Sequence, residues 1–357
     1  MDTTYLGKYG QLSCLNTEFL KNSDLESLIN LETEKEFLSY LENRFYKVEV
    51  QKFSNSYTMP DLYTMIINYH MVSHIKDALQ SLPYGGKAFV SAYLNKFDTE
   101  NIKVILSSKS LNYKVDQFEP FLMINDMPVG YITGSIPEEE YKALMEQPDV
   151  EGIVNSLAEY GYGVALMERL EDFRSQGNLI GMFNTLDSYY YTRLFEQFNM
   201  YVGSQPSIGN YLRSLVDIHN VSLLAKRIVS SNKDKDIDDL DDFIVDSGSI
   251  TKQELLNSKF DTIESLAGLN IPGASKAVEA YNRSGLLGSI ETEMKYALYN
   301  EYLPKLKMSS MGLNTVMYYI IRSEIERDNL RVIMLGKYYD MGNEFIRSNV
   351  IKLSNEA

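Results

Sequence analysis

The chain has 357 residues, of which 44% are hydrophobic and 23% charged, a balance typical of folded globular proteins rather than disordered ones. Its length suits two or three domains. The formal net charge of −15 argues against nucleic-acid binding, because phosphates need a basic surface, and favours solubility or a basic protein partner. Cys14 is the single cysteine, so no intramolecular disulfide is possible and a cytoplasmic location is the simplest expectation. No stretch approaches the roughly 20 apolar residues that span a bilayer.

The first part of the chain has the patterns of short helices. Residues 6–20 form an amphipathic segment, and residues 24–46 are dense in helix formers with apolar residues at helical spacing. Residues 47–53 alternate briefly, as a short strand would, but strand signals are weak throughout. We therefore predict a nearly all-α chain. Stretches with the composition of linkers lie at residues 51–60, 83–87, 231–242 and 268–275.

Two kinds of long helix then alternate along the chain. The first kind opens with an acid, is rich in tyrosine, and occurs at residues 61–79, 187–198 and 293–306. The second kind follows each of these and contains an asparagine three residues after an acid. The three acid and asparagine pairs are Asp98 with Asn101, Asp217 with Asn220, and Glu326 with Asn329.

Each asparagine of the second kind of helix lies on an apolar helical face. Around all three, apolar residues occur eight and four positions before the asparagine and three and four positions after it. This spacing places the amide toward the core. Because a buried amide needs partners for its donors and acceptor, we expect each asparagine to bond a neighbouring segment and fix how that segment docks.

The spacing of these landmarks indicates three tandem repeats. The asparagines lie 119 and 109 residues apart, and a second landmark, a Leu-to-Leu pattern at 28–41, 144–157 and 255–266, recurs at nearly the same interval. We predict repeats at residues 1–142, 143–254 and 255–357. Because residues repeated once per structural unit usually belong to the framework of the repeat, the six acid and asparagine residues are assigned a structural role and no catalytic role.

The third repeat is shorter than the other two. Gly-Ser-Ile turns follow the asparagine helix at residues 134–136 and 248–250, and Thr251 with Glu254 is a capping box. Pro137 is placed as a first-turn proline. After Asn329 only one final helix, at residues 343–353, remains. We expect residues 6–20 to be helical and to cover the apolar face that this truncation leaves, near the C-terminal part of the chain.

Other groupings give weak evidence for chemistry. His70 and His74 are four residues apart on a predicted helix and could share a metal, but Met71 stands where a zinc peptidase needs glutamate and no third ligand is evident. Residues 83–87 resemble a phosphate loop only in Gly-Lys, and residues 234–245 lack the glycine and glutamate of a calcium loop. No catalytic, cofactor-binding or metal-binding residue is assigned.

The repeated helices resemble a known family. The segments LVDIHNVSLLAKR (215–227), NLRVIMLGKYYDMGNEFIR (329–347) and DTENIKVIL (98–106) look like the C subunit of bacterial and archaeal V/A-type rotary ATPases, a family that includes the d subunit of the vacuolar enzyme. The resemblance covers nearly the whole chain in the family's order. A basic residue six positions after the asparagine, common in the family, is matched by Lys226 but not by Ser107 or Leu335.

The resemblance implies an all-α, funnel-shaped protein of three similar lobes with pseudo-threefold symmetry. Such a protein is a non-catalytic part of the central stalk, present once per complex. It lies on the cytoplasmic face of the membrane as a peripheral component, between the shaft subunits D and F and the membrane rotor ring, and needs no cofactor. The alternatives are a helical-repeat adaptor for other protein partners and a metal-dependent enzyme that uses His70 and His74.

Overall fold

The computed structural model describes most of the chain as helix. The described residues are 18–80, 82–111, 123–124, 127–128, 136, 138–230, 243–258, 260–308 and 312–354. In this part of the chain the only strands are β1 (Met123–Ile124) and β2 (Met127–Pro128), which pair antiparallel. The prediction of an all-helical protein is confirmed apart from this short ladder. None of the helices among the described residues is long and apolar enough to cross a membrane.

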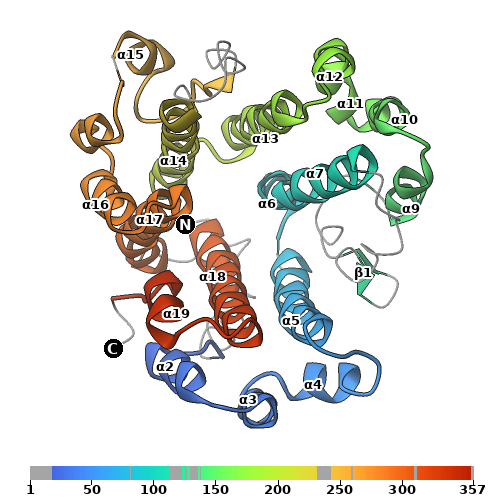
Figure 1. Cartoon of the computed structure of the whole chain (residues 1–357), viewed down its shortest axis with the longest axis vertical. Helices are drawn as coiled ribbons and strands as arrows, with labels where there is room; N and C mark the ends of the chain where they lie inside the picture. Colours follow the sequence, from blue (N-terminus) through green and yellow to red (C-terminus); the bar gives the residue numbers. More distant parts are fainter. Residues whose placement is uncertain are drawn as a thin grey trace. The chain divides into compact units, whose positions relative to one another are not determined.

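The chain packs into two compact units (Figure 1). Unit 1 combines residues 1–81 with residues 203–357, and unit 2 consists of residues 82–202. Unit 1 therefore joins both ends of the chain, whereas unit 2 is one continuous piece. The units reflect packing and the predicted repeats reflect sequence similarity, so the two divisions need not coincide, and the repeat boundaries stay a prediction.

The first helices of unit 1 are α2, α3, α4 and α5, at Asn22–Asn30, Glu34–Glu42, Lys47–Phe53 and Asp61–Gln80. Thr33 caps α3, since its side chain accepts the Glu36 N–H and Glu36 accepts the Thr33 N–H. The brief alternation at residues 47–53 does not form a strand, because this segment is α4, in line with the predicted all-α chain. Val50 and Phe53, three residues apart, point into the core and Val48 is exposed, so the apolar residues follow a helical period.

In unit 1, α18 (Leu313–Tyr338) packs against α5, α17, α19, α2 and α14 (Figure 1). Most of the α18 side chains are buried, polar ones included. The other elements are α14 (Pro206–Ser230), α15 (Lys252–Asn257), the 3₁₀ helix η5 (Ile263–Gly268), α16 (Ala274–Ser284), α17 (Leu287–Met308) and α19 (Asn343–Asn349). The capping box predicted at Thr251 and Glu254 is present at the start of α15.

An apolar core within unit 2 includes residues of α7, α10 and α13. Lys103 on α7 also pairs with Asp187 on α13, with 2.5 Å between Nζ and Oδ1. The linker expected at residues 83–87 is instead the start of α6, where the Lys87 N–H bonds the Pro83 carbonyl. The elements are α6 (Tyr84–Leu94), α7 (Lys96–Ser110), α9 (Glu138–Glu146), α10 (Val150–Ser156), η3 (Leu157–Tyr160), α11 (Tyr162–Met167), α12 (Leu170–Gln176) and α13 (Ile180–Tyr201).

Candidate functional site

The second acid and asparagine pair lies on the buried face of α14. Asn220 is fully buried, and its side chain forms two hydrogen bonds to the backbone of Val245: Nδ2 donates to the carbonyl at 2.9 Å, and Oδ1 accepts the N–H at 3.0 Å. The carboxamide thus pairs with one residue as a neighbouring strand would. It satisfies both backbone groups of a residue that lies outside any helix or strand, so the segment around Val245 is fixed against α14.

Asp217, one turn earlier on α14, binds the same segment further along. Its Oδ1 accepts the N–H groups of Ser249 at 2.9 Å and Ile250 at 3.3 Å, and its Oδ2 accepts the Ser249 hydroxyl. Gly248 permits this approach, because a Cβ there would lie 2.3 Å from Asp217 Oδ1. Burial raises the pKa of the Asp217 carboxyl, while the bonds from Ser249 and Ile250 oppose that rise.

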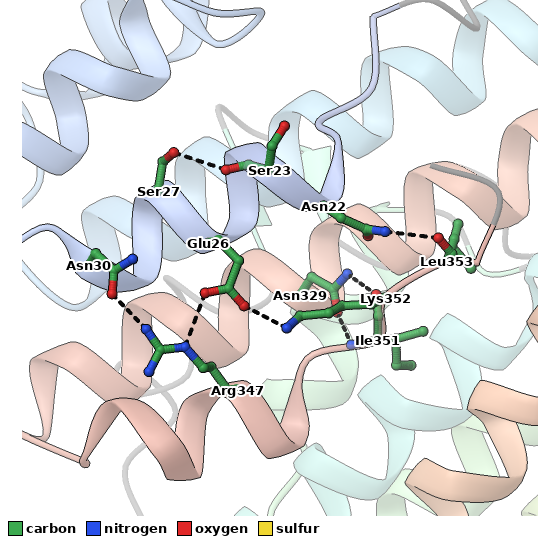
Figure 2. Close-up of polar contacts among 10 residues, drawn as sticks. All are labelled: Asn22, Ser23, Glu26, Ser27, Asn30, Asn329, Arg347, Ile351, Lys352 and Leu353. Atoms are coloured by element: carbon green, nitrogen blue, oxygen red, sulfur yellow. Dashed lines mark hydrogen bonds and ion pairs between the residues drawn. The ribbon is translucent and has the colours of Figure 1, made fainter. Parts of the chain in front are cut away.

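The third pair repeats this arrangement on α18. Asn329 forms the same two bonds to Ile351, with Nδ2 donating to the carbonyl at 2.8 Å and Oδ1 accepting the N–H at 2.7 Å (Figure 2). Glu326 accepts the Leu20 N–H at 2.6 Å and the Tyr46 hydroxyl at 2.5 Å. Glu326 therefore binds the N-terminal part of the chain, whereas Asn329 binds the C-terminal part.

The groups around Glu326 shift the pKa of its carboxyl in opposite directions. Burial raises the pKa of its carboxyl, and His70, the Tyr46 hydroxyl, the Leu20 N–H and Arg322 lower it. Burial and the nearby Glu326 charge in turn raise the pKa of Tyr46 well above its usual value. The carboxylate is held by donors from its own chain, an arrangement suited to holding segments together.

The first pair is only partly visible. Asp98 is fully buried on α7, and its Oδ1 accepts the Tyr141 hydroxyl from α9 at 2.5 Å. Asn101 is also buried and acts on the same hydroxyl: a hydrogen bond from its side chain lowers the pKa of Tyr141, which burial and the Asp98 charge raise. Because much of the segment after α7 lies outside the described residues, the docking role of Asn101 stays a prediction. Pro137 and residues 234–242 lie outside them too.

His70 and His74 are buried between helices of unit 1. The Nδ1 of His70 lies 2.8 Å from Oε1 of Glu49, the Nδ1 of His74 lies 3.2 Å from the Ser323 hydroxyl, and the ring centroids are 4.3 Å apart. Burial and the neighbouring His70 lower the pKa of His74 to about 3. Within the described ranges no three side chains of histidine, cysteine, aspartate or glutamate are grouped as metal ligands.

Sequence reasoning found the acids and asparagines but missed most of their partners. No local pattern identifies Tyr46 and Tyr141 as hydroxyl donors, and nothing near Val245 or Ile351 predicts that its backbone pairs with an asparagine. The Gly-Ser-Ile turn at residues 248–250 was the one available signal, because a recurring glycine indicates a close backbone approach.

Comparison with known proteins decides the family. The family model for the ATP synthase (C/AC39) subunit matches residues 10–349, which include all three acid and asparagine pairs. The chain belongs to the C/AC39 family. The resemblance that the sequence predicted is therefore confirmed.

Curated C subunits of A-type ATP synthases match most or nearly all of this chain. The C subunit of the A-type ATP synthase of Thermoplasma acidophilum is 32% identical over 98% of this chain and 99% of its own length. The corresponding protein of Thermoplasma volcanium is 33% identical over 97% and 98%. That of Methanocaldococcus jannaschii is 23% identical over 94% of this chain and 81% of its own length.

Proposed function

We propose that this chain is the C subunit of an A-type ATP synthase and acts there as a non-catalytic part of the central stalk. The observation that carries the proposal is the end-to-end match to curated C subunits, with 32% identity over 98% of this chain and 99% of the Thermoplasma acidophilum protein. A match over both full lengths concerns the whole protein and not one shared domain.

In this role the protein connects the shaft subunits D and F to the membrane rotor ring, on the cytoplasmic side and as a peripheral component. The acids on α14 and α18 support a mechanical role, since Asp217 and Glu326 hold backbone and hydroxyl groups of their own chain. Buried polar bonds of this kind fix how segments dock and stiffen the fold. Stiffness is what a part that transmits torque needs.

We further propose that residues 1–142, 143–254 and 255–357 are three similar helical lobes with pseudo-threefold symmetry. The shared geometry of the second and third pairs supports this: Asn220 and Asn329 each bond both backbone groups of one residue, at Val245 and Ile351. Identical bonding at equivalent positions of two sequence repeats is expected if the repeats share one structure.

Titration against a purified D and F pair tests the stalk role. We expect binding at low salt that weakens as salt is added, because a chain of net charge −15 attracts a basic partner surface partly through screened charge. We also expect no ATP hydrolysis by the purified chain.

The controls separate this role from the alternatives. An adaptor for other proteins would not bind the D and F pair even at low salt, and that result would contradict the proposal. ATP hydrolysis by homogeneous protein would contradict the non-catalytic part. Metal analysis of the same sample tests the enzyme alternative at His70 and His74.

A further inference from the structure

The segment that bonds to the acid and asparagine of α14 differs in one respect from the segment that bonds to those of α18. Around α14 it is continuous: Val245 pairs with Asn220, Ile250 donates to Asp217, and α15 begins two residues later at Lys252. The Thr251 N–H before this helix is accepted by Glu254, three residues on, at 2.9 Å.

Around α18 the equivalent segment is split between the two ends of the chain. Ile351 pairs with Asn329, but the N–H that Glu326 accepts belongs to Leu20, and α2 begins two residues after it at Asn22. The Lys21 N–H before α2 is accepted by Asp24, again three residues on, at 2.8 Å. Leu20 and α2 therefore take the place that Ile250 and α15 take in the second repeat.

Side-chain hydrogen bonds and ion pairs join α2 to residues 347–353 near the other end of the chain (Figure 2). Asn22 Nδ2 donates to the Leu353 carbonyl at 2.8 Å. Glu26 on α2 pairs with Arg347 Nε at 3.0 Å and with Lys352 Nζ at 2.5 Å, and hydrogen bonds from both lower the pKa of its carboxyl. Arg347 Nη2 also donates to Asn30 Oδ1 at 2.6 Å.

The junction between the ends and α18 is closely packed. A cavity of only ≈ 10 Å³ remains there, between Asn22, Glu326 and Leu353, which is room for about one water molecule. The two ends thus form one surface against α18, without a covalent bond between them.

We propose that residues 20–30 and 343–354 form a terminal clasp that opens as one cooperative unit while α18 stays folded. The segment around α14 is a continuous chain and cannot part in this way. The ion pairs and the Asn22 bond that join the two segments lie at partly exposed positions, whereas the buried Leu28, Ile29 and Ile346 lie in α2 and α19, which pack on each other and on α18. Because the two helices share these contacts, they are expected to open together. Opening frees the Leu20 and Ile351 amides together.

Hydrogen exchange of the full-length chain, resolved to single amides, tests the clasp. Glu26→Gln removes both ion pairs yet touches neither Leu20 nor Ile351. We expect both amides to exchange about two- to fivefold faster, by the same factor, because exposed ion pairs of this kind contribute little each. The Val245 and Ser249 amides, which dock on α14, should keep their rates.

The matched control is Glu301→Gln, which removes an ion pair with Lys305 inside α17 from a carboxylate that is 35% exposed, as that of Glu26 is. It should leave the Leu20 and Ile351 amides unchanged. Unchanged rates in Glu26→Gln, faster exchange at one of the two amides alone, or an equal acceleration at Val245 and Ser249 would each overturn the proposal.

A second pair of variants tests the bond between Asn22 and Leu353 without altering charge. Asn22→Ala removes the bond to Leu353, and Asn43→Ala removes a bond to Ser39 that stays within and next to α3. Asn22→Ala should accelerate Leu20 and Ile351 equally, and Asn43→Ala neither. Acceleration of Leu20 without Ile351 in Asn22→Ala would show that the two ends move independently.

Discussion

Asn220 and Asn329 both use the one feature that an asparagine side chain shares with a peptide group, a donor and an acceptor in one plane. Within a helix the backbone groups are already paired, so α14 and α18 can bind another segment only through side chains. A carboxamide on the buried face supplies both bonds at once to Val245 or Ile351. A hydrophobic residue there would fill the space but leave two backbone groups unpaired.

Replacing Asn220 by leucine tests this role. The change Asn220→Leu leaves the N–H and carbonyl of Val245 without partners in a buried site, at a total cost of about 1 to 3 kcal/mol. We expect the free energy of unfolding, measured by urea denaturation, to fall by roughly that amount.

The control lies on the same helix. Asn210 is exposed, and among the described residues its Oδ1 accepts a hydrogen bond from the neighbouring Arg213 alone. Asn210→Leu should change the free energy of unfolding by no more than about 0.5 kcal/mol. Equal effects of the two variants would show that Asn220 does not hold the docking segment.

At the scale of elements, the segment at residues 243–251 acts as a strap across α14 although it has no regular structure. Asn220 binds one end of it and Asp217 the other. The strap lies close to the helix because Gly248 has no side chain at the point where the Asp217 carboxylate accepts its bonds. The following helix α15 then begins from a fixed position.

Gly248→Ala tests the close approach. The new Cβ would lie 2.3 Å from Asp217 Oδ1, so either the carboxylate or the strap must move. Overpacking of this kind costs about 1 to 3 kcal/mol, which thermal or urea unfolding would report.

Gly268→Ala is the matched control, since nothing lies within 4 Å of a Cβ at Gly268. We expect it to leave the free energy of unfolding nearly unchanged. If Gly248→Ala were equally harmless, the strap would have to be looser than its bonds to Asp217 indicate.

On the scale of the whole molecule, unit 1 is closed by contacts between distant parts of the chain. The packing of α5 against α18 buries His74 beside Ser323, with its ring next to the rings of Phe19 and Tyr319. His70 from α5 lies next to it, and Glu326 and Arg322 of α18 act on the same cluster. Protonation of this cluster is therefore coupled to the stability of unit 1.

The pH dependence of stability follows from the pKa of His74, which burial lowers from 6.5 to about 3. Between these values the unfolded chain binds a proton at His74 and the folded chain does not. The free energy of unfolding therefore falls as the pH drops below about 6.5, by up to about 1.4 kcal/mol per pH unit from this residue. The raised pKa of Glu326 acts in the opposite sense, because its folded form takes up a proton first.

His74→Phe isolates the histidine contribution while keeping a ring in the aromatic cluster. Urea denaturation between about pH 7 and about pH 5 should show a smaller loss of stability than in the unmodified protein. Ser323→Ala removes the hydrogen-bond partner but keeps the imidazole, so it should retain the full pH slope. The same slope in His74→Phe would show that His74 is not the group responsible.

The expectation for the beginning of the chain is resolved in part. Most of residues 6–20 lies outside the described residues, and Glu18, Phe19 and Leu20 are not helical. Leu20 nevertheless bonds Glu326, and Phe19 packs on Tyr319, so this segment contacts the C-terminal part of the chain as expected.

The sequence by itself determined the long helices, the buried position of Asn220 and Asn329, the cap at Thr251 and the family. These depend on local spacing, since a helical period or a cap involves residues a few positions apart. Only the tertiary structure decided that Glu326 binds Leu20 and Tyr46, and that α2 continues the segment which Ile351 begins. Those partners lie about 300 residues from Glu326 along the chain, and no local pattern specifies a contact at that separation, because folding alone brings the two ends together.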